Sequence, residues 1–115
     1  MYKRQLLRAY DSNEQHWVRS YVDYCRDLKS RASKIWLEAS LYEEAGDISI
    51  GGHPDFAAIV DGDLYIVDLK TGDISVDPED NKQLLVYHWL LRNEYYNNVY
   101  YSIHQQGICR TTERG

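Results

Sequence analysis

Apolar positions along the chain change their spacing several times, and each change predicts a new element. Between residues 13 and 30, apolar side chains recur every three to four positions, which predicts a helix. Residues 34–42 alternate instead between apolar and polar side chains, which predicts a strand after a break at residues 30–33. Residues 43–53 are acidic and contain glycine, so we expect a connection that at most extends this strand.

Two apolar runs, residues 56–60 and 63–67, flank the dipeptide Asp61-Gly62. An Asp-Gly pair between such runs is a strong local signal for a tight hairpin turn. Both faces of this hairpin are apolar over most of their length. We therefore expect the sheet that contains it to be covered on both sides.

The register of this hairpin brings charged side chains together. Counting outward from the turn places Asp55 opposite Asp68 and His53 opposite Lys70. Like charges that face each other across an antiparallel pair are destabilising, because their Cβ atoms lie only about 4.5–5.5 Å apart. Two such aspartates need a shared proton or a cation between them, and Mg²⁺ is a suitable cation. Lys70 shares the face of Asp68, so the cluster predicts a site that holds a metal and stabilises a phosphate.

The C-terminal half predicts one helix followed by two strands. Asp77 and Pro78 form a helix start, with Asp77 as the N-cap and Pro78 at the first helical position. We expect the helix to run to about Glu94 and to be deeply buried, because it is apolar on most sides. Strands are expected over residues 99–105 and 108–112, with a turn between them.

Composition sets bounds on the class of protein. The chain has 115 residues, the length of one domain, and 43% of them are hydrophobic, which allows a modest core. No apolar run is long enough to span a membrane, and no secretory signal pattern is visible. Cys25 and Cys109 lack the spacing of metal ligands, so we expect reduced thiols in a cytoplasmic protein.

The net charge of −5 counts against a nucleic-acid-binding protein, but the charges are unevenly distributed. Most acidic residues lie between Glu43 and Asp80, around the predicted metal site, where a bound cation would invert the local field. A basic run precedes this stretch, and it either contacts phosphates or forms a solvated helix face. This run consists of Arg19, Arg26, Lys29, Arg31 and Lys34.

The ordered motifs of the chain resemble those of the PD-(D/E)XK nuclease superfamily. Pro54-Asp55 followed by Asp68-Leu69-Lys70 matches the signature of that superfamily. Residues 83–87, Gln-Leu-Leu-Val-Tyr, resemble the Q-x-x-x-Y motif of its RecB-like branch, and Gly52 and Thr71-Gly72 also fit that branch. The resemblance covers roughly residues 21–106, and it extends to phage-borne RecB-type nucleases.

This resemblance implies a fold and an activity. The fold would be α/β with a restriction-endonuclease-like core, in which helices flank a mixed central sheet. The activity would be hydrolysis of DNA phosphodiester bonds with Mg²⁺, for which Mn²⁺ is a possible substitute, and an exonuclease is favoured over an endonuclease. The biological setting would be phage or prophage DNA processing and recombination, with other recombination proteins as partners.

The resemblance also implies roles for single residues. Asp55, Asp68 and the backbone carbonyl of Leu69 would bind the metal. Lys70 would steady the attacking hydroxide or the phosphorane, although a weak surface ion pair with Asp68 is the alternative. All four positions lie within Pro54-Asp55 and Asp68-Leu69-Lys70.

Four further side chains carry less specific expectations. The resemblance implies that Gln83 and Tyr87, which are four apart and share a helix face, position the substrate or the lysine. Their alternative role is to donate hydrogen bonds to the edge of the sheet. Glu38 either supports the site or is an ordinary surface acid, whereas we expect His53 to be a bystander.

The first residues and the overall role leave alternatives open. Residues 2–5, Tyr-Lys-Arg-Gln, match the translation of a common sequencing adapter, which predicts an N-terminally truncated fragment. An upstream helix with a His or Glu, usual in RecB-like nucleases, would then be missing.

The alternative function is a non-catalytic DNA-binding or assembly module that retains the fold. An acidic mimic of DNA is a third reading, which leaves the Q-x-x-x-Y helix unexplained.

Overall fold

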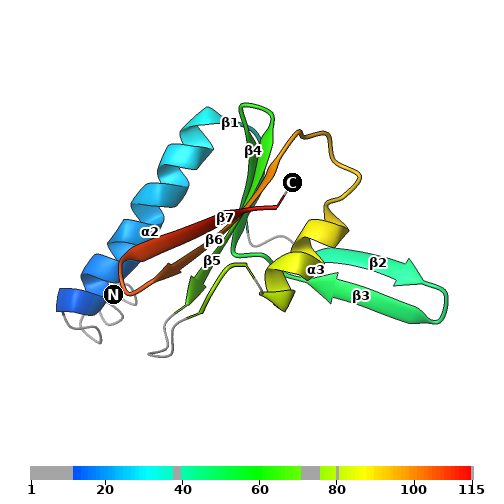
Figure 1. Cartoon of the computed structure of the whole chain (residues 1–115), viewed down its shortest axis with the longest axis horizontal. Coiled ribbons are helices and arrows are strands. Elements are labelled where there is room, and N and C mark those ends of the chain that lie inside the picture. The colour runs from blue at the N-terminus through cyan, green and yellow to red at the C-terminus, as the bar shows by residue number, and fades with distance from the viewer. Residues whose placement is uncertain (1–11, 38–39, 71–75, 80, 115) are drawn as a thin grey trace, which may run out of the picture.

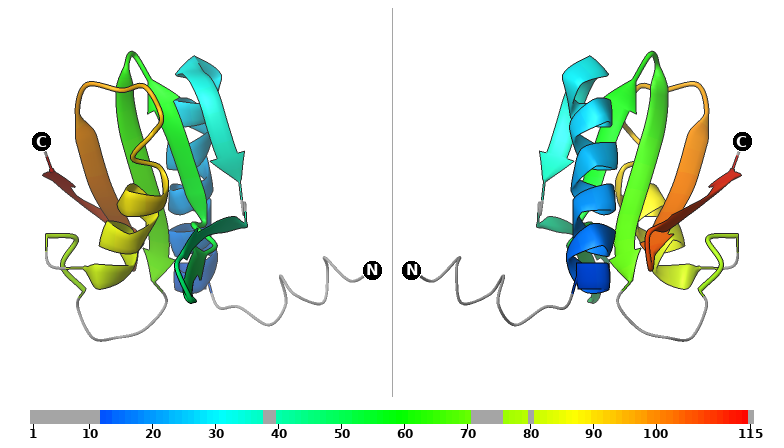
Figure 2. Two further views of the ribbon diagram at one scale, coloured as in Figure 1. Left: turned by 90° about the vertical axis from the view of Figure 1, so that its right-hand side faces the viewer. Right: turned by 90° about the vertical axis from the view of Figure 1, so that its left-hand side faces the viewer.

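A computed structural model describes residues 12–37, 40–70, 76–79 and 81–114 of the chain. A five-stranded mixed sheet lies between two helices, α2 (Ser12–Arg31) and α3 (Lys82–Leu90), as Figures 1 and 2 show. This arrangement confirms the predicted fold class, an α/β restriction-endonuclease-like core with a mixed central sheet. No helix in the described ranges is long and apolar enough to cross a bilayer.

The central sheet has the strand order β1-β4-β5-β6-β7, and only the β5–β6 pair is parallel. A second sheet of two antiparallel strands, β2 and β3, extends beyond α3 (Figure 1). The bounds of the strands are β1 (Ala32–Leu37), β2 (Leu41–Ala45), β3 (Ile48–Gly52), β4 (Phe56–Val60), β5 (Asp63–Lys70), β6 (Val99–Gln105) and β7 (Ile108–Glu113). The β6 and β7 strands confirm the two strands predicted at the C-terminal end.

The β4–β5 hairpin has the predicted two-residue turn. Asp61 and Gly62 both have positive φ angles, 52° and 83°, as a type I′ turn requires. Val60 pairs with Asp63, which is the predicted register. The short turn therefore sets which side chains of the two strands share a face.

The paired part of this hairpin is shorter than predicted. The β4–β5 ladder ends at the Phe56–Val67 pair, so His53 does not face Lys70 across it. Lys70 pairs instead with Gln105 on the parallel strand β6. Residues 53 and 54 belong to no strand, and Asp55 lies in a bend directly before β4.

Both faces of the sheet are covered, as the hairpin pattern predicted. Alternate residues of β4 enter two different cores: Ala57 and Ile59 pack on the α3 side, whereas Phe56 and Ala58 pack on the α2 side. The α3-side core also contains Leu64, Ile66, Leu84, Tyr87, Leu91, Val99, Tyr101 and Ile103. Burial of these apolar side chains fixes the orientation of the whole hairpin, including the charged residues at its end.

The sequence prediction was wrong for residues 30–52. Helix α2 continues to Arg31 and β1 follows at once, so the break predicted at residues 30–33 is absent. The predicted strand over 34–42 is divided between β1 and β2, and the predicted connection contains β3. The β2–β3 hairpin turns at Gly46-Asp47, where Gly46 has a φ angle of 67°. Arg92 after α3 adds a bidentate salt bridge to Glu43, with both N···O distances 2.7 Å.

The sequence prediction for α3 also needs correction. Asp77 is not the N-cap of the helix, because α3 begins only at Lys82; the Asp77 carboxylate accepts a hydrogen bond from the amide of Glu79 in the preceding turn. Asn81 caps α3 instead, with Oδ1 accepting from the amide of Leu84 at 3.0 Å. The helix ends at Leu90 rather than near Glu94.

Helix α3 is also less buried than predicted. Its apolar residues do not all face the sheet, since Leu85 is 47% exposed and Trp89 is 36% exposed. Leu84 and Tyr87 are the residues of the helix that enter the core. The helix therefore presents a partly apolar outer surface.

Some expectations concern residues outside the described ranges. These are the adapter-like residues 2–5, the dipeptide Thr71-Gly72 and the proposed supporting acid Glu38. Cys25 and Cys109 do lie within the described ranges, and both are free thiols.

Candidate active site

Asp68 and Lys70 lie at the carboxyl end of β5, on the face of the sheet that α3 covers. Their spacing of two residues places them on the same face as the core residues Leu64 and Ile66. Asp68 is only 4% exposed, and its Oδ2 atom lies 2.7 Å from Nζ of Lys70. A buried carboxylate and an ammonium group are therefore held together where the apolar core ends.

Asp55 reaches the same place from the segment before β4. Its Oδ2 atom accepts a hydrogen bond of 2.9 Å from the backbone amide of Leu69. In a continued antiparallel ladder this amide would donate to the backbone carbonyl at position 54, opposite position 69. The Asp55 side chain has replaced that backbone partner, and this bond fixes the carboxylate beside Asp68.

Pro54 has a further consequence for the same strand. In an antiparallel pair, the N–H and C=O of one residue point toward the same neighbouring strand. The Leu69 carbonyl therefore faces the edge that carries Asp55, where the ladder would offer it the amide of residue 54. Proline has no amide hydrogen, so this ladder bond cannot form. The sequence Pro54-Asp55 thus places a carboxylate beside a backbone carbonyl that has no ladder donor.

The pKa of Asp68 is raised to about 6. Burial is the largest cause, followed by hydrogen bonding with the neighbouring Asp55 carboxyl, whose charge acts in the same direction. Lys70 acts in the opposite direction and lowers this pKa. Lys70 Nζ lies 2.7 Å from Asp68 Oδ2, so this buried oxygen is paired with the ammonium group. The Asp68 carboxylate is therefore held between a neighbouring acid that opposes its ionisation and a cation that favours it.

Gln83 and Tyr87 extend this cluster from α3. Gln83 Oε1 accepts a hydrogen bond of 2.9 Å from Lys70 Nζ, and its Nε2 donates one of 2.6 Å to Tyr87 Oη. Burial raises the pKa of Tyr87, and Asp68 and Asp55 add to this shift, so the hydroxyl stays protonated. Among the described residues, the Q-x-x-x-Y pair is thus connected to Lys70 through Gln83.

The charged end of β5 has the donor atoms that a hard divalent cation prefers. Asp55 and Asp68 supply carboxylate oxygens, and the Leu69 carbonyl supplies a third oxygen at the same edge. The closeness of the Asp55 and Asp68 carboxyls, which raises the pKa of Asp68, is the observation that best fits a cation here. Among the described residues, no three His, Cys, Asp or Glu side chains form a metal-binding group, so a metal would need backbone and solvent oxygens as well.

One residue near the site was not assigned a role by the sequence reasoning. Gly52, at the end of β3, touches the ring of Tyr87: a Cβ atom at this position would lie 2.6 Å from Tyr87 Cε1. Any larger residue would displace the tyrosine that holds Gln83. The paired glycines 51 and 52, three residues before Asp55, were the available signal, but only the tertiary structure shows what they touch.

The basic run of α2 and β1 does not join this cluster. Helix α2 covers the other face of the sheet, and the five side chains of the run are exposed. Arg31 pairs with Asp27 and Asp61, and Lys34 pairs with Glu94. These contacts favour the interpretation of the run as a solvated surface.

The histidines lie outside the cluster of Asp55, Asp68 and Lys70. His16 and His53 are exposed. His88 contacts Tyr101 through Nδ1, and His104 is buried on the α2 side of the sheet. In the described structure, none of these four histidines is hydrogen-bonded to Lys70, Gln83 or Tyr87.

A comparison with known families agrees with this geometry. A family model of the PD-(D/E)XK nuclease superfamily matches residues 2–109, and the chain therefore belongs to this superfamily. Membership suggests nuclease activity on DNA, in a superfamily whose enzymes generally use divalent metal ions. A search of curated proteins found no match.

Proposed function

We propose that this chain is a metal-dependent deoxyribonuclease that hydrolyses phosphodiester bonds at the end of β5. The observation that carries the proposal is the joint position of Asp55, Asp68 and Lys70, with Asp55 bonded to the amide of Leu69 and Lys70 within 2.7 Å of Asp68. Two neighbouring carboxyl groups, each of which makes ionisation of the other less favourable, lower the stability of the folded chain. A functional role explains why they are kept together beside an ammonium group.

In this proposal the residues of the chain have separate tasks. Asp55, Asp68 and the carbonyl of Leu69 bind Mg²⁺, or Mn²⁺ in its place. When bound, the ion would lower the pKa of a coordinated water and neutralise charge on the phosphate. Lys70 places a positive charge where negative charge develops on the phosphate in the transition state.

Gln83 and Tyr87 act as positioning residues for this ammonium group. Lys70 has a long flexible stem, and the hydrogen bond to Gln83 Oε1 limits the positions that its Nζ atom occupies. Tyr87 in turn fixes which end of the Gln83 amide faces the lysine. Side chains held by a second layer of contacts give the geometry that catalysis needs.

The finer parts of the proposal come from the motifs. The Q-x-x-x-Y residues support assignment to the RecB-like branch, and with it an exonuclease in phage or prophage recombination that acts in the cytoplasm with other recombination proteins. We also propose that residues 1–115 form a single nuclease core. The bonding of Gln83 to Lys70 supports the branch assignment, because it gives this motif a role at the site.

The first test removes the acid and the lysine one at a time. Purified Asp68→Ala and Lys70→Ala proteins should remain folded and lose at least 100-fold of the Mg²⁺-dependent cleavage of labelled DNA, because both groups act on the transition state (roughly 10²–10³ per stabilising group). Asp47→Ala and Lys29→Ala are matched controls on exposed surfaces away from the site, and they should cleave like the parent protein. Undiminished cleavage by either site variant would refute the assignment.

The second candidate function is a DNA-binding or assembly module without catalysis. The observation in its favour is that the described residues contain no group of three metal-binding side chains. Calorimetric titration with Mg²⁺ and Mn²⁺ separates the two candidates. A nuclease site should bind one of these ions in a manner that Asp68→Ala abolishes, whereas a module has no need of either ion.

A further inference from the structure

A second cluster of polar groups lies on the α3 side of the sheet, apart from Asp55, Asp68 and Lys70. Two cavities of about 440 Å³ and about 150 Å³ meet here, and both are bordered by Leu85 and Arg114. His88 also borders the larger cavity, and Lys82 borders the smaller one. A volume of this size is within the range of small-ligand sites.

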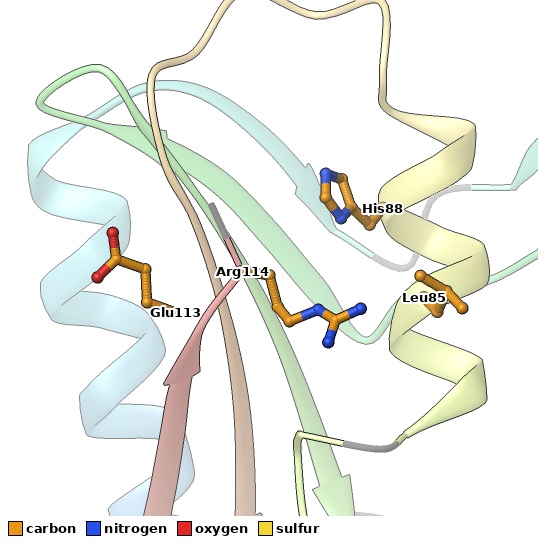
Figure 3. Close-up of a pocket in the computed structure, with 4 residues that line it drawn as sticks. All are labelled: Leu85, His88, Glu113 and Arg114. Carbon is orange, nitrogen blue, oxygen red and sulfur yellow. The ribbon is translucent and has the colours of Figure 1, made fainter.

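Arg114 enters this space from the end of β7. Its backbone amide donates a hydrogen bond of 2.7 Å to the carbonyl of Val99, which fixes the point from which the side chain starts. The guanidinium carbon lies 5.6 Å from the centre of the Tyr101 ring, and Figure 3 shows the side chain directed toward Leu85 and His88 on α3. The guanidinium group is therefore held against one wall of the cavity.

The positive charges of the two cavities have no carboxylate partner in the structure as described. No salt bridge joins Arg114 or Lys82 to an acidic side chain among the described residues. Arg31, Lys34, Lys70 and Arg92 do have such partners. Arg114 and Lys82 differ from the cations of α2 in that both border the smaller of these two cavities.

Two acidic residues border the same cavities and have to be counted. Glu113 pairs with Tyr100, whose side chain stacks on Tyr65 of the α2-side face, so the pleat directs the Glu113 side chain to that other face. Figure 3 shows its carboxylate directed away from His88 and Leu85. Glu79 borders the smaller cavity and offsets one positive charge. Among the described residues that border the cavities, Arg114 and Lys82 together with Glu79 leave one net positive charge on this face.

We propose that these cavities are a second anion site, which binds a backbone phosphate of the DNA strand at a distance from the bond that is cut. The guanidinium fork of Arg114 matches the oxygens of a phosphate, and Lys82 adds a second cationic donor. Leu85 supplies an apolar wall against which the attached sugar packs. This inference rests on the proposed nuclease function and adds a contact that orients its substrate.

The position of the cavities relative to the predicted active site supports a shared strand. Lys82 and Gln83 are consecutive residues at the start of α3, and Gln83 contacts Lys70 while Lys82 borders the smaller cavity. Along β6, the cavities lie near Tyr101, four residues from the Gln105 that pairs with Lys70, or about 13 Å. A nucleic-acid strand covers such a distance in a few nucleotides.

The test measures binding and does not depend on cleavage. Asp68→Asn protein in EDTA serves as the parent, and its affinity for a labelled oligothymidylate that spans both sites is measured by fluorescence anisotropy. Adding Arg114→Gln should weaken this affinity about tenfold, because a charge-assisted contact is lost. The slope of log affinity against log salt should fall by about 0.7, the contribution of one phosphate on a single strand.

One control and a second variant locate the effect. Arg19→Gln removes the same charge from α2 on the other face and should leave the affinity unchanged. Lys82→Gln, an exposed substitution, provides a second variant with a several-fold loss if Arg114→Gln does not fold.

Several results would overturn the proposal. One is a parent protein that does not bind the oligonucleotide at low salt. Another is that Arg114→Gln and Lys82→Gln bind like the parent. The third is that Arg19→Gln loses as much affinity as Arg114→Gln. Failure of the proposed nuclease function is seen separately, as an unsubstituted chain that does not cut DNA with Mg²⁺. A chain that binds through Arg114 but does not cut would keep the anion site and remove the catalytic assignment.

Discussion

Asp68 and His104 lie on neighbouring strands, one register position apart, and the sheet turns them to opposite faces. Asp68 is beside Ile103 in the parallel β5–β6 pair, and Leu69 is beside His104. Both side chains are buried, with 4% and 3% of their surface exposed. Their surroundings differ: Asp68 has Lys70 and Asp55 next to it, whereas His104 packs against the rings of Tyr21 and Tyr24.

The difference shows how burial acts on an acid and on a base. Burial raises the pKa of Asp68 to about 6 and lowers the pKa of His104, so each side chain is driven toward its neutral form. Lys70 opposes this effect at Asp68, and within the described ranges neither ring nitrogen of His104 has a hydrogen-bond partner. On the α3 face, Lys70 favours the charged form of the buried Asp68. On the α2 face, burial keeps the His104 ring neutral.

The largest expected effect on stability comes from neutralising Asp68. Its folded pKa is above the unfolded value of 3.8, so the folded state binds the extra proton, and stability decreases as the pH rises from about 4 through 6. In EDTA, Asp68→Asn should therefore stabilise the chain by on the order of 2 kcal/mol at pH 8. Urea unfolding at pH 8 and at pH 4 measures this, and the gain should disappear at the lower pH.

Two outcomes would contradict this comparison. An Asp68→Asn protein that is less stable than the parent at pH 8 would mean that the ion pair with Lys70 outweighs burial and the repulsion from Asp55. A gain of equal size at both pH values would mean that the ionisation of Asp68 is not its cause. Asp47→Asn, an exposed acid in the β2–β3 turn, is the matched control and should change stability little.

A smaller effect with the opposite dependence on pH is expected at His104. Because burial lowers its pKa in the folded state, the unfolded state binds more protons below about pH 6.5, and stability is lost as the pH falls. His104→Phe should therefore reduce the loss of stability between pH 7 and pH 5 by about 1 kcal/mol. Thermal or urea unfolding at both pH values provides the measurement.

The controls for His104 use the other histidines. Part of the acid sensitivity should remain in His104→Phe, because burial and Arg114 also lower the pKa of His88. His53→Gln, on an exposed side chain, should leave the pH dependence unchanged. An unaltered acid response in His104→Phe would show that the neutral ring at this position is not responsible.

Local signals explain why part of the fold was predictable. The Asp61-Gly62 turn needs only two residues with positive φ, and once it forms, the alternation of side chains sets the register and the faces of β4 and β5. The β2–β3 hairpin also has a local signal, the two-residue turn Gly46-Asp47 with Gly46 at φ 67°, which the sequence interpretation did not use. The start of α3 was misassigned because Asp77-Pro78 and Asn81 are both acceptable helix starts, and only the packed structure selects Asn81.

In the candidate site, too, some positions follow from local sequence and others depend on contacts between distant segments. The pairing of Asp55 with Asp68 followed from a count along one hairpin, and the structure brings the two together although the ladder stops one residue short. The bonding of Gln83 to Lys70, the contact of Gly52 with Tyr87 and the cavities beside Arg114 join segments far apart in sequence. No local pattern specifies such contacts, because they depend on how α3 packs on the sheet.

The smallest expected effect concerns the contact between Tyr87 and Gln83. Tyr87→Phe keeps the ring against Gly52 and removes only the hydroxyl that accepts from Gln83 Nε2. Lys70 then loses part of its restraint, so kcat should fall about threefold to tenfold (roughly 1 kcal/mol for one hydrogen bond) with KM and stability nearly unchanged. Steady-state kinetics on labelled DNA would measure the two constants separately.

A double-mutant cycle shows whether this effect passes through Gln83. If Tyr87 acts only by holding the Gln83 amide toward Lys70, then Gln83→Ala should lose at least as much kcat as Tyr87→Phe, and the double variant should lose no more than Gln83→Ala alone. Additive losses would instead mean that the Tyr87 hydroxyl acts on Asp68 or on the substrate directly. In that case Gln83 and Tyr87 would each contribute to catalysis separately. The difference between the α3 face and the α2 face of the sheet would then rest on Asp68 and Lys70 alone.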